Sequence, residues 1–398
     1  MLEFSSSSNG LTSTKEAVKT AILDASSGRN PTDCHFVAVH LSMGHDHTEL
    51  LKSIREHCPN ARIAGCTCAG VIGREGANET MRAVAIMMIW GDQNQIALSY
   101  TNQLDGSNSR EAAAQLAKEL QDSKGKPQFV MFLASGINVD TTLSIEGIES
   151  VLTDNVTIFG GTSADNMKGI ASFQFVDDKV YEHAAMLIGF YDPSLSVYTQ
   201  ASHGFVAAGV EMTVTKSKGN RVHEIDGKPA WETYTSLLGL PASASPSDTI
   251  PPGAVGVKLS PELAQEYGDT HLLRVITHRE PDGTLLMPVN CPEGTTLSLM
   301  LRDEERIFAN LDVMMRQIKE ACGDRKIVAV FHADCGARGR LTLDRVAKEE
   351  IVREMQQPLF GNQTGPWLGM YGFGEFARLG GRNEFHNYTT ALYVITRA

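Results

Sequence analysis

The chain has 398 residues, of which 42% are hydrophobic and 21% charged, a balance typical of folded globular proteins. A single hydrophobic core rarely serves more than about 250–300 residues, so we expect two domains. The net charge is −12 and Lys and Arg form no block, which disfavours nucleic acid and anionic membranes as partners. Apolar runs such as residues 83–90 are strand-sized and far below the ~18–20 residues that span a bilayer.

The N-terminal residues 1–22 are rich in Ser, Thr and Glu where a secretory signal has a basic start and an apolar run, so we expect a cytoplasmic protein. The seven cysteines are odd in number and scattered, which does not indicate a disulfide framework. Free thiols in a reducing compartment are expected.

The first part of the chain alternates helical and strand patterns, as in a sheet with crossover helices. Helices are predicted at 13–26, 47–58, 109–121 and 141–152, and strands at 35–41, 61–66, 82–90, 95–101, 128–134 and 156–160. Beyond residue 166 the runs shorten and turns become frequent, which favours antiparallel strands at 170–175, 184–191, 196–202 and 211–217.

A helix at 229–238 is followed by residues 241–253, where Pro, Ser and Gly crowd together, and we place the boundary between two domains, 1–240 and 241–398, near this segment. The last part mixes strands at 271–277, 296–301, 326–331 and 388–396 with helices at 303–321 and 342–355. The pattern predicts two packed α/β domains with mixed parallel and antiparallel sheets.

Two glycine-containing loops follow predicted strands, where open α/β sheets bind ligands. The first, GCTCAGVIG, contains Gly65 and Cys66, and the second, FGGTSADN, contains Gly160, Gly161 and Asp165. Small residues let backbone N–H groups approach a ligand, but they also serve tight packing in a turn. The Asp165 carboxylate has two roles open to it as well: holding a ligand ammonium or closing an Asx-turn.

A metal site is a further hypothesis at this sheet edge. His45 and His47 follow one predicted strand, and Cys66 and Cys68 follow the next, so four ligand-type side chains would meet if the two strands are neighbours. The alternatives are helix capping for the Asp-His pair and buried, unligated thiols.

The C-terminal part holds two more segments of interest. HADCGARG places Cys335 three residues before Arg338, and a thiolate beside a guanidinium has a lowered pKa and can act as a nucleophile. Glu375 stands among apolar residues, so it is either paired with a cation such as Arg338 or faces a pocket. Inert packing of the cysteine and structural pairing of the arginine are the other readings.

These segments together resemble the FIST family of intracellular sensors, which have an N-terminal and a C-terminal FIST domain. ARIAGCTCAGVI is similar to the family's Gly-Cys-Ser-Thr-x-Gly turn, FGGTSADN to its Gly-Gly-x-x-x-Asp loop, and residues 202–234 to the end of the N-terminal domain. FHADCGARGRL resembles the Cys-x-x-Arg-Gly element, and residues 370–395 resemble the Tyr-x-x-Gly-Glu and His-Asn-x-Thr elements, which adds Tyr371 to the expected ligand-binding residues. Thr67 and Cys68 depart from the family's usual Ser and Thr.

The resemblance implies a small-ligand sensor that regulates a separate partner, such as a histidine kinase, a chemotaxis protein or a cyclic-dinucleotide enzyme. Two ligands are implied: an amino-acid-like metabolite, for which opposite charges at Asp165, Arg338 and Glu375 suit an ammonium and a carboxylate, or haem that senses nitric oxide. Haem needs an axial ligand, and the histidines at strand ends are the candidates: His203, His45, His47, His332 and His386.

An enzyme and a scaffold are the competing classes. The enzyme would use Cys335 as nucleophile with a base such as His332. Neither GxxxxGK[ST] nor HExxH occurs in the chain, which favours a sensor without its own output activity. A homo-oligomer is left open by the sequence.

Overall fold

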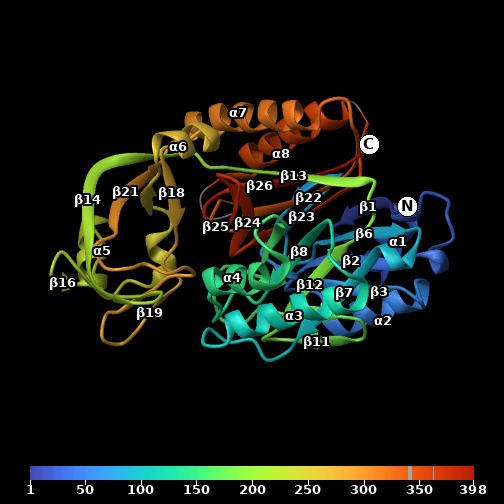
Figure 1. Ribbon diagram of the computed structural model, residues 1–398, viewed down its shortest axis with the longest axis horizontal. Coiled ribbons are helices and arrows are strands. Elements are labelled where there is room, and N and C mark those ends of the chain that lie inside the picture. The colour runs from blue at the N-terminus through green and yellow to red at the C-terminus, as the bar shows by residue number, and fades with distance from the viewer. Residues whose placement is uncertain (339–342, 362) are drawn as a thin grey trace.

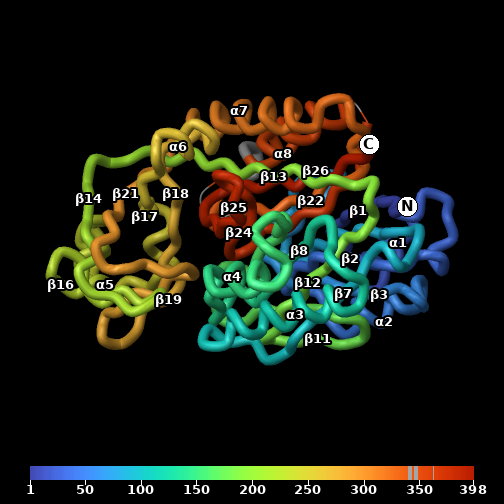
Figure 2. The backbone as a smooth tube through the Cα atoms, viewed as in Figure 1, coloured from blue at the N-terminus to red at the C-terminus, as the bar shows by residue number. Residues whose placement is uncertain are grey.

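The computed structural model describes residues 1–338, 343–361 and 363–398. They form a larger body built around three sheets and a smaller lobe built around a fourth, seen at the left of Figure 1. Both termini lie in the body. The smooth tube of Figure 2 shows that the chain leaves the body for the lobe after β13 and returns to it before α7. Residues 339–342, where the predicted segment 332–339 ends and the predicted helix 342–355 begins, lie outside the described residues.

The first sheet of the body has two helices on one face. Its strands in spatial order are β1 (Glu3–Asn9), β6 (Val84–Trp90), β2 (Phe36–Ser42), β3 (Arg62–Cys68), β10 (Gln174–Val176) and β11 (Lys179–Tyr181). The helices are α1 (Thr14–Ser26) and α2 (His47–His57), capped by the side chains of Ser13 and Asp46. Alternate residues such as Val37 and Val39 face these helices, while Phe36 and Ala38 face the interior of the body, as the period of a strand requires.

The second sheet carries strands from both ends of the chain. Its order is β25 (Arg382–His386), β24 (Gly374–Leu379), β9 (Thr157–Thr162), β8 (Phe129–Ala134), β12 (Ala185–Phe190) and β7 (Ile96–Thr101). The helices α3 (Ser109–Lys124) and α4 (Thr141–Leu152) pack against each other and cover its outer face. Short 3-10 turns, η1 (Pro31–Asp33) and η2 (Gln93–Gln95), precede β2 and β7.

The third sheet is also shared between distant parts of the chain. Its order is β13 (Leu195–Ser202), β26 (Thr390–Arg397), β22 (Lys326–Cys335), β23 (Trp367–Gly372), β4 (Val71–Gly73) and β5 (Gly76–Asn78). The helices α7 (Glu304–Cys322) and α8 (Arg345–Phe360) pack on its outer face, along the upper edge in Figure 1. The inner faces of the three sheets meet in one core, where Phe159 lies 5.5 Å from Phe331 and 5.0 Å from Tyr393 between ring centroids.

The lobe is an antiparallel structure with its own smaller core. Its strands are β18 (His271–Arg274), β17 (Ala254–Lys258), β21 (Thr296–Arg302), β14 (Phe205–Lys218), β15 (Arg221–Ile225), β20 (Leu285–Leu286) and β19 (His278–Arg279), with β16 (Lys228–Pro229) beside β15. It also contains α5 (Ala230–Leu237) and η3 (Pro246–Thr249), while α6 (Pro261–Tyr267) contacts β13 and β24 of the body.

The predicted fold class is confirmed: the fold is a mixed α/β fold with mixed sheets. The expected division into 1–240 and 241–398 is a division along the sequence, whereas in space strands from both parts share the second and third sheets. The Pro- and Ser-rich segment near 241–253 lies within the lobe, where the Trp231 indole N–H donates to the Ala242 carbonyl over 2.8 Å. Among the described residues, no helix combines the length and apolar character needed to cross a membrane.

Candidate functional site

The loops singled out in the sequence meet where the second and third sheets approach each other. Tyr371 at the end of β23 exchanges backbone hydrogen bonds with the 65–73 loop, donating to Gly70 over 2.8 Å and accepting from Ala69 over 2.9 Å. Gly372 accepts a hydrogen bond of 2.7 Å from the amide of Gly336, and Phe373 donates over 3.1 Å to the carbonyl of a residue in the 159–166 loop. Segments far apart in the sequence are thus held within hydrogen-bonding distance of one another.

Glycines make these close approaches feasible. A Cβ at Gly372 would lie 2.6 Å from the carbonyl oxygen of Thr162, and a Cβ at Gly336 would lie 2.5 Å from the Met167 sulfur. A side chain at Gly372 would force the loops apart, whereas one at Gly336 would displace the end of the Met167 side chain. The small residues of these motifs therefore serve packing between loops.

A buried cluster of ionisable side chains occupies this meeting point. Arg338 and Asp334, each 3% exposed, form an ion pair with 3.2 Å between Nε and Oδ1. Glu375 is 0% exposed, and its Oε2 accepts a hydrogen bond of 2.7 Å from the Thr389 hydroxyl. Its other oxygen, Oε1, is buried and has no hydrogen-bond partner among the described residues. A buried carboxyl oxygen without a partner is costly, and this one is a ready acceptor for a donor from outside the protein.

The cluster is electrostatically coupled. Burial raises the pKa of Glu375 well above its usual range, and the nearby Asp334 carboxylate raises it further, whereas the Thr389 hydrogen bond and the Arg338 guanidinium act in the opposite direction. Burial likewise raises the pKa of the Tyr371 hydroxyl. Burial therefore favours the protonated, neutral form of the Glu375 carboxyl group.

The site adjoins the lobe. Tyr388 and Cys335 of the body share a buried apolar cluster with residues of the lobe, and the Tyr388 ring lies 5.3 Å from the ring of Phe205, between centroids. A change in the polar cluster is therefore placed to affect the contact between body and lobe.

Cys335 lacks the features of an activated nucleophile. It is 3% exposed, and burial raises the pKa of its thiol well above the usual range, with the neighbouring Glu375 and Asp334 acting in the same direction. The expectation that Arg338 lowers this pKa is overturned, because Arg338 pairs with Asp334 and burial dominates at the thiol.

We therefore expect Cys335 to resist alkylation in the native protein. Iodoacetamide at pH 7.5 should leave it unmodified over hours, because the reactive thiolate is almost absent and the sulfur is buried, and should label it rapidly in 8 M urea. Peptide mass spectrometry of both samples measures this. Rapid labelling of native Cys335 would show that its thiol is accessible and ionised, and would favour a Cys-dependent enzyme.

Asp165 is engaged by its own loop. Its carboxylate accepts hydrogen bonds of 2.8, 3.1 and 2.9 Å from the backbone N–H groups of Lys168, Gly169 and Ile170. Of the two roles that the sequence leaves open for Asp165, the structure shows the local one, in which the carboxylate holds the turn of its own loop. Asp165 is not joined to Arg338 or Glu375 by any hydrogen bond or ion pair found in the described residues.

The remaining predicted loop residues are also packed tightly. A Cβ at Gly65 would overlap the backbone of Val39 in the neighbouring strand. Gly160 has a positive φ of 116° and accepts a hydrogen bond of 2.7 Å from the Tyr393 hydroxyl, while Gly161 pairs directly with Glu375 across β9 and β24. Cys66 lies 3.6 Å from the Met370 sulfur, which links the first loop to the strand that leads into the cluster.

The proposed metal ligands are not gathered into a site. β2 and β3 are parallel neighbours, as the hypothesis required. However, the Cys68 thiol points to the Leu41 carbonyl at 3.5 Å, His45 Nδ1 lies 3.0 Å from the Thr14 hydroxyl, and the His47 ring packs 4.9 Å from Phe173. Within the described ranges, no group of three or more His, Cys, Asp or Glu side chains could hold a metal ion.

The five candidate haem ligands are all buried or partly buried, and none lines the cavity described below. His203 and His386 direct Nε2 at carbonyl oxygens of His271 and Ala377, at 2.8 and 3.4 Å, which makes these nitrogens donors and not ligands. His45, His47 and His332 each retain one buried nitrogen without a hydrogen-bond partner among the described residues. Haem binding stays a prediction of the sequence.

Several residues of the cluster were missed by sequence reasoning. Asp334 lies within the HADC segment and Thr389 within the predicted strand 388–396, but neither had a predicted role. A second buried group joins body and lobe: His203 Nδ1 lies 3.0 Å from Asp269, and Asn310 donates to the same carboxylate over 2.8 Å. Asp269 and Asn310 carry no local signal, because they become partners only through tertiary packing.

The fold and the site together define a mixed α/β protein whose buried polar cluster comes from the C-terminal part of the chain and packs against backbone of the N-terminal part. Residues 35–228 match the FIST N domain and residues 230–378 match the FIST C domain, so the chain belongs to the FIST family, whose domains are associated with sensory signalling. The family resemblance of the motifs is confirmed.

Individual relatives are distant. The chain is 22% identical over 326 residues to the uncharacterized protein MJ1623 of Methanocaldococcus jannaschii, a match that covers 78% of this chain and 60% of that protein. Among solved structures, a cyanuric acid hydrolase from A. caulinodans aligns over the full length of both chains with 8% identity and a TM-score of 0.40. A second cyanuric acid hydrolase structure gives 9% and 0.37. Likenesses at this level carry no argument about function.

Proposed function

We propose that this protein is a small-ligand sensor whose ligand is an amino-acid-like zwitterion, bound at the buried cluster of Arg338, Asp334 and Glu375. Membership of the FIST family supports the sensory role. The observation that carries the ligand class is Glu375 Oε1, a fully buried carboxyl oxygen without a partner among the described residues. The buried Arg338 guanidinium acts on this carboxyl group electrostatically.

The charges suit such a ligand. An ammonium group donates to carboxylate oxygens, and Glu375 Oε1 has the acceptor capacity for it. A ligand carboxylate pairs with a guanidinium, and Arg338 is held in place from one side by Asp334 at 3.2 Å. Two opposite charges at a fixed separation distinguish a zwitterion from a simple amine or a simple acid.

Binding is coupled to proton release in this proposal. Burial raises the pKa of Glu375 and so favours its neutral form in the unliganded site. A bound ammonium favours the carboxylate, so the proton leaves Glu375 as the ligand binds. Affinity therefore rises with pH until the pH exceeds the pKa of Glu375 in the unliganded protein.

The position of the site supports a route for the signal. Ligand entry requires the junction between body and lobe to open, because the cluster is closed to solvent in this structure. The Tyr388 and Phe205 contact spans that junction, so occupancy changes how lobe and body are held together. A separate signalling protein, such as a histidine kinase, a chemotaxis protein or a cyclic-dinucleotide enzyme, would sense this change at the surface. A non-enzymatic role agrees with the buried, protonated Cys335.

Thermal unfolding in the presence of an amino-acid panel tests the proposal. A ligand present at 100 times its Kd should stabilise the protein by about 2.7 kcal/mol, which raises Tm measurably. Glu375→Gln and Arg338→Lys should each abolish the ligand-induced shift, whereas Glu320→Gln, at an exposed position of α7, should preserve it. The absence of any shift at millimolar concentrations of every amino acid would reject this ligand class.

A further inference from the structure

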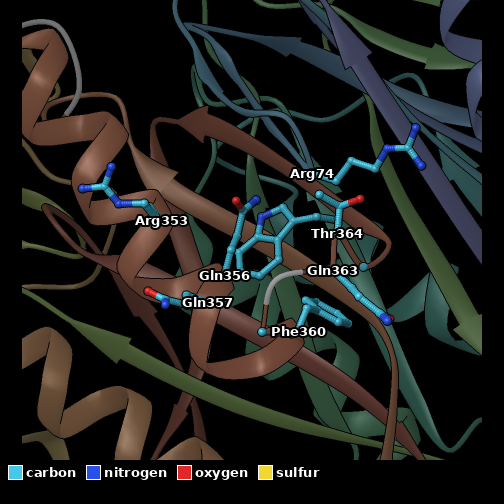
Figure 3. A pocket seen from close by; sticks show the side chains of 10 residues that line it. Arg74, Arg353, Gln356, Gln357, Phe360, Gln363 and Thr364 are labelled. Carbon is cyan, nitrogen blue, oxygen red and sulfur yellow. The ribbon is translucent and has the colours of Figure 1, made fainter.

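A cavity of about 290 Å³ lies at the C-terminal end of α8, away from the cluster described above. Figure 3 shows Gln356, Gln357 and Phe360 of α8 on one side of the cavity and Thr364 on the other, with Arg353 and Arg74 at opposite edges and their guanidinium groups turned outward. The lining residues come from α8, the segment before β23, β23 itself and the turn after β4: Arg74, Arg353, Gln356, Gln357, Phe360, Gly361, Gln363, Thr364, Gly365 and Trp367.

Two aromatic residues line the cavity, the buried Trp367 and the half-buried Phe360, whose ring offers an apolar surface to a flat ligand. Phe360 and Trp367 meet edge to face, with 6.4 Å between ring centroids. A Cβ at Gly365 would overlap the Phe360 ring, so the glycine lets this ring lie flat on the backbone. Planar heteroaromatic ligands stack favourably on such rings.

The wall of the cavity also includes a buried donor without a partner among the described residues. Trp367 is 1% exposed, and its indole N–H has no hydrogen-bond partner among the described residues. Buried Trp N–H groups usually find a partner, which makes this one a marker for a missing acceptor. A ring nitrogen or carbonyl oxygen of a ligand would supply it.

The polar lining consists of amides and arginines. Gln356, Gln357 and Gln363 offer paired donors and acceptors, the arrangement that recognises adenine edges bidentately. Gln356 is already oriented by a hydrogen bond of 2.8 Å from its amide nitrogen to the Gly73 carbonyl.

The lining residues carry positive charge in a chain whose net charge is −12. Two arginines and no Asp or Glu line the cavity. Arg353 is paired with Glu350 only at 3.8 Å and is 66% exposed, so it can turn to an anion, whereas Arg74 is held by Glu75 at 2.7 Å. The local charge favours a ligand that carries a phosphate.

We propose that this cavity binds a purine nucleotide, with the base between Phe360 and the glutamine amides, a base acceptor on the Trp367 N–H, and the phosphate toward Arg353. The volume of about 290 Å³ falls just below the usual range for small-molecule sites, about 300–1,000 Å³. The cavity shares no residue with the Arg338 and Glu375 cluster, so the two sites stand or fall separately.

Isothermal titration of the full chain with adenosine 5′-monophosphate (AMP), adenosine and inorganic phosphate tests this inference. AMP should bind with a Kd below about 1 mM, adenosine about threefold to tenfold more weakly, and inorganic phosphate without measurable heat. The order follows because the base supplies stacking and hydrogen bonds while the phosphate adds one charged contact.

Two variants locate the site. Trp367→Phe keeps a ring but removes the N–H and should weaken AMP binding about threefold to tenfold. Arg353→Gln should weaken AMP about threefold while leaving adenosine unchanged, and Arg316→Gln on the exposed face of α7 should change neither. The inference is overturned if AMP does not bind, if inorganic phosphate competes as well as AMP, or if Arg353→Gln behaves like Arg316→Gln.

Discussion

Between pH 7 and pH 5, the His40→Leu variant is expected to lose about 2 kcal/mol less of its free energy of unfolding than the wild type. His40 is 2% exposed, and burial lowers the pKa of its imidazole to about 3. The folded protein therefore keeps His40 neutral at pH 5, whereas the unfolded chain protonates it below about pH 6.5. Because the unfolded state binds the extra proton, stability is full above pH 6.5 and is lost as the pH falls.

His40 is a suitable position for this measurement because its side chain has few polar ties. The Nδ1 atom of its ring lies 3.5 Å from the Cys66 sulfur, which is a weak hydrogen-bond partner. His386, whose pKa burial also lowers to about 3, is instead bonded to Tyr267 over 3.2 Å, so its replacement would remove a hydrogen bond as well.

Urea unfolding of the wild type and of His40→Leu at pH 7, 6 and 5 gives the difference directly. His278→Leu, at an exposed strand of the lobe, is the matched control and should follow the wild-type pH dependence. If wild type and His40→Leu lose stability in parallel as the pH falls, His40 is already protonated in the folded protein and its assignment as a neutral buried group is wrong.

Much of the architecture could be predicted from local pattern. The alternation of β-branched runs and amphipathic segments predicted β2, β3, β6, α1 and α2 of the first sheet, but not β1 or β11. The adjacency of β2 and β3, a condition of the metal hypothesis, agrees with the short helical crossover between them. The Asp-His start of α2 was expected as a capping site, and Asp46 does accept the Glu49 amide over 2.8 Å.

The pairing of distant strands could not be predicted. Gly161 lies opposite Glu375 because β24 inserts beside β9, and Met370 lies opposite Val71 because β4 leaves its own sheet to join β23. No periodicity in either strand encodes the partner, since the register is set by the fit of the three sheets around their common core. The motifs were therefore identified singly, and their convergence was visible only in the structure.

Side-chain partners were the least predictable feature. Asp165 has the same loop context as a ligand-binding acid, yet three backbone amides satisfy it. Arg338 was expected to act on Cys335, but the carboxylate four residues before it in the sequence, Asp334, takes the guanidinium. In both cases a nearby backbone or carboxylate group binds the side chain that was expected to bind a ligand or act on a thiol. The sequence alone does not show which partner the side chain takes.

Glu375→Gln is expected to be more stable than the wild type at pH 8 and to lose this advantage as the pH falls toward 5. Burial raises the pKa of Glu375 in the folded protein, whereas the unfolded chain ionises it above about pH 4.3. The folded state therefore holds a proton that the unfolded state releases, so stability falls as the pH rises from about 4.3 toward the folded-state pKa. Glutamine has no such proton, and the gap between the two proteins should widen by about 1.4 kcal/mol per pH unit over that window.

Stability falls with rising pH because of Glu375 but with falling pH because of His40. One set of unfolding curves at several pH values therefore distinguishes the effects of the two residues. Glu320→Gln on the exposed surface of α7 should track the wild type throughout. Parallel curves for wild type and Glu375→Gln would mean that Glu375 is ionised in the folded protein and already has a donor at Oε1. A zwitterionic ligand that ionises Glu375 should itself flatten the wild-type curve between pH 6 and 8 and leave that of Glu375→Gln unchanged, because the group that it deprotonates is absent from the variant.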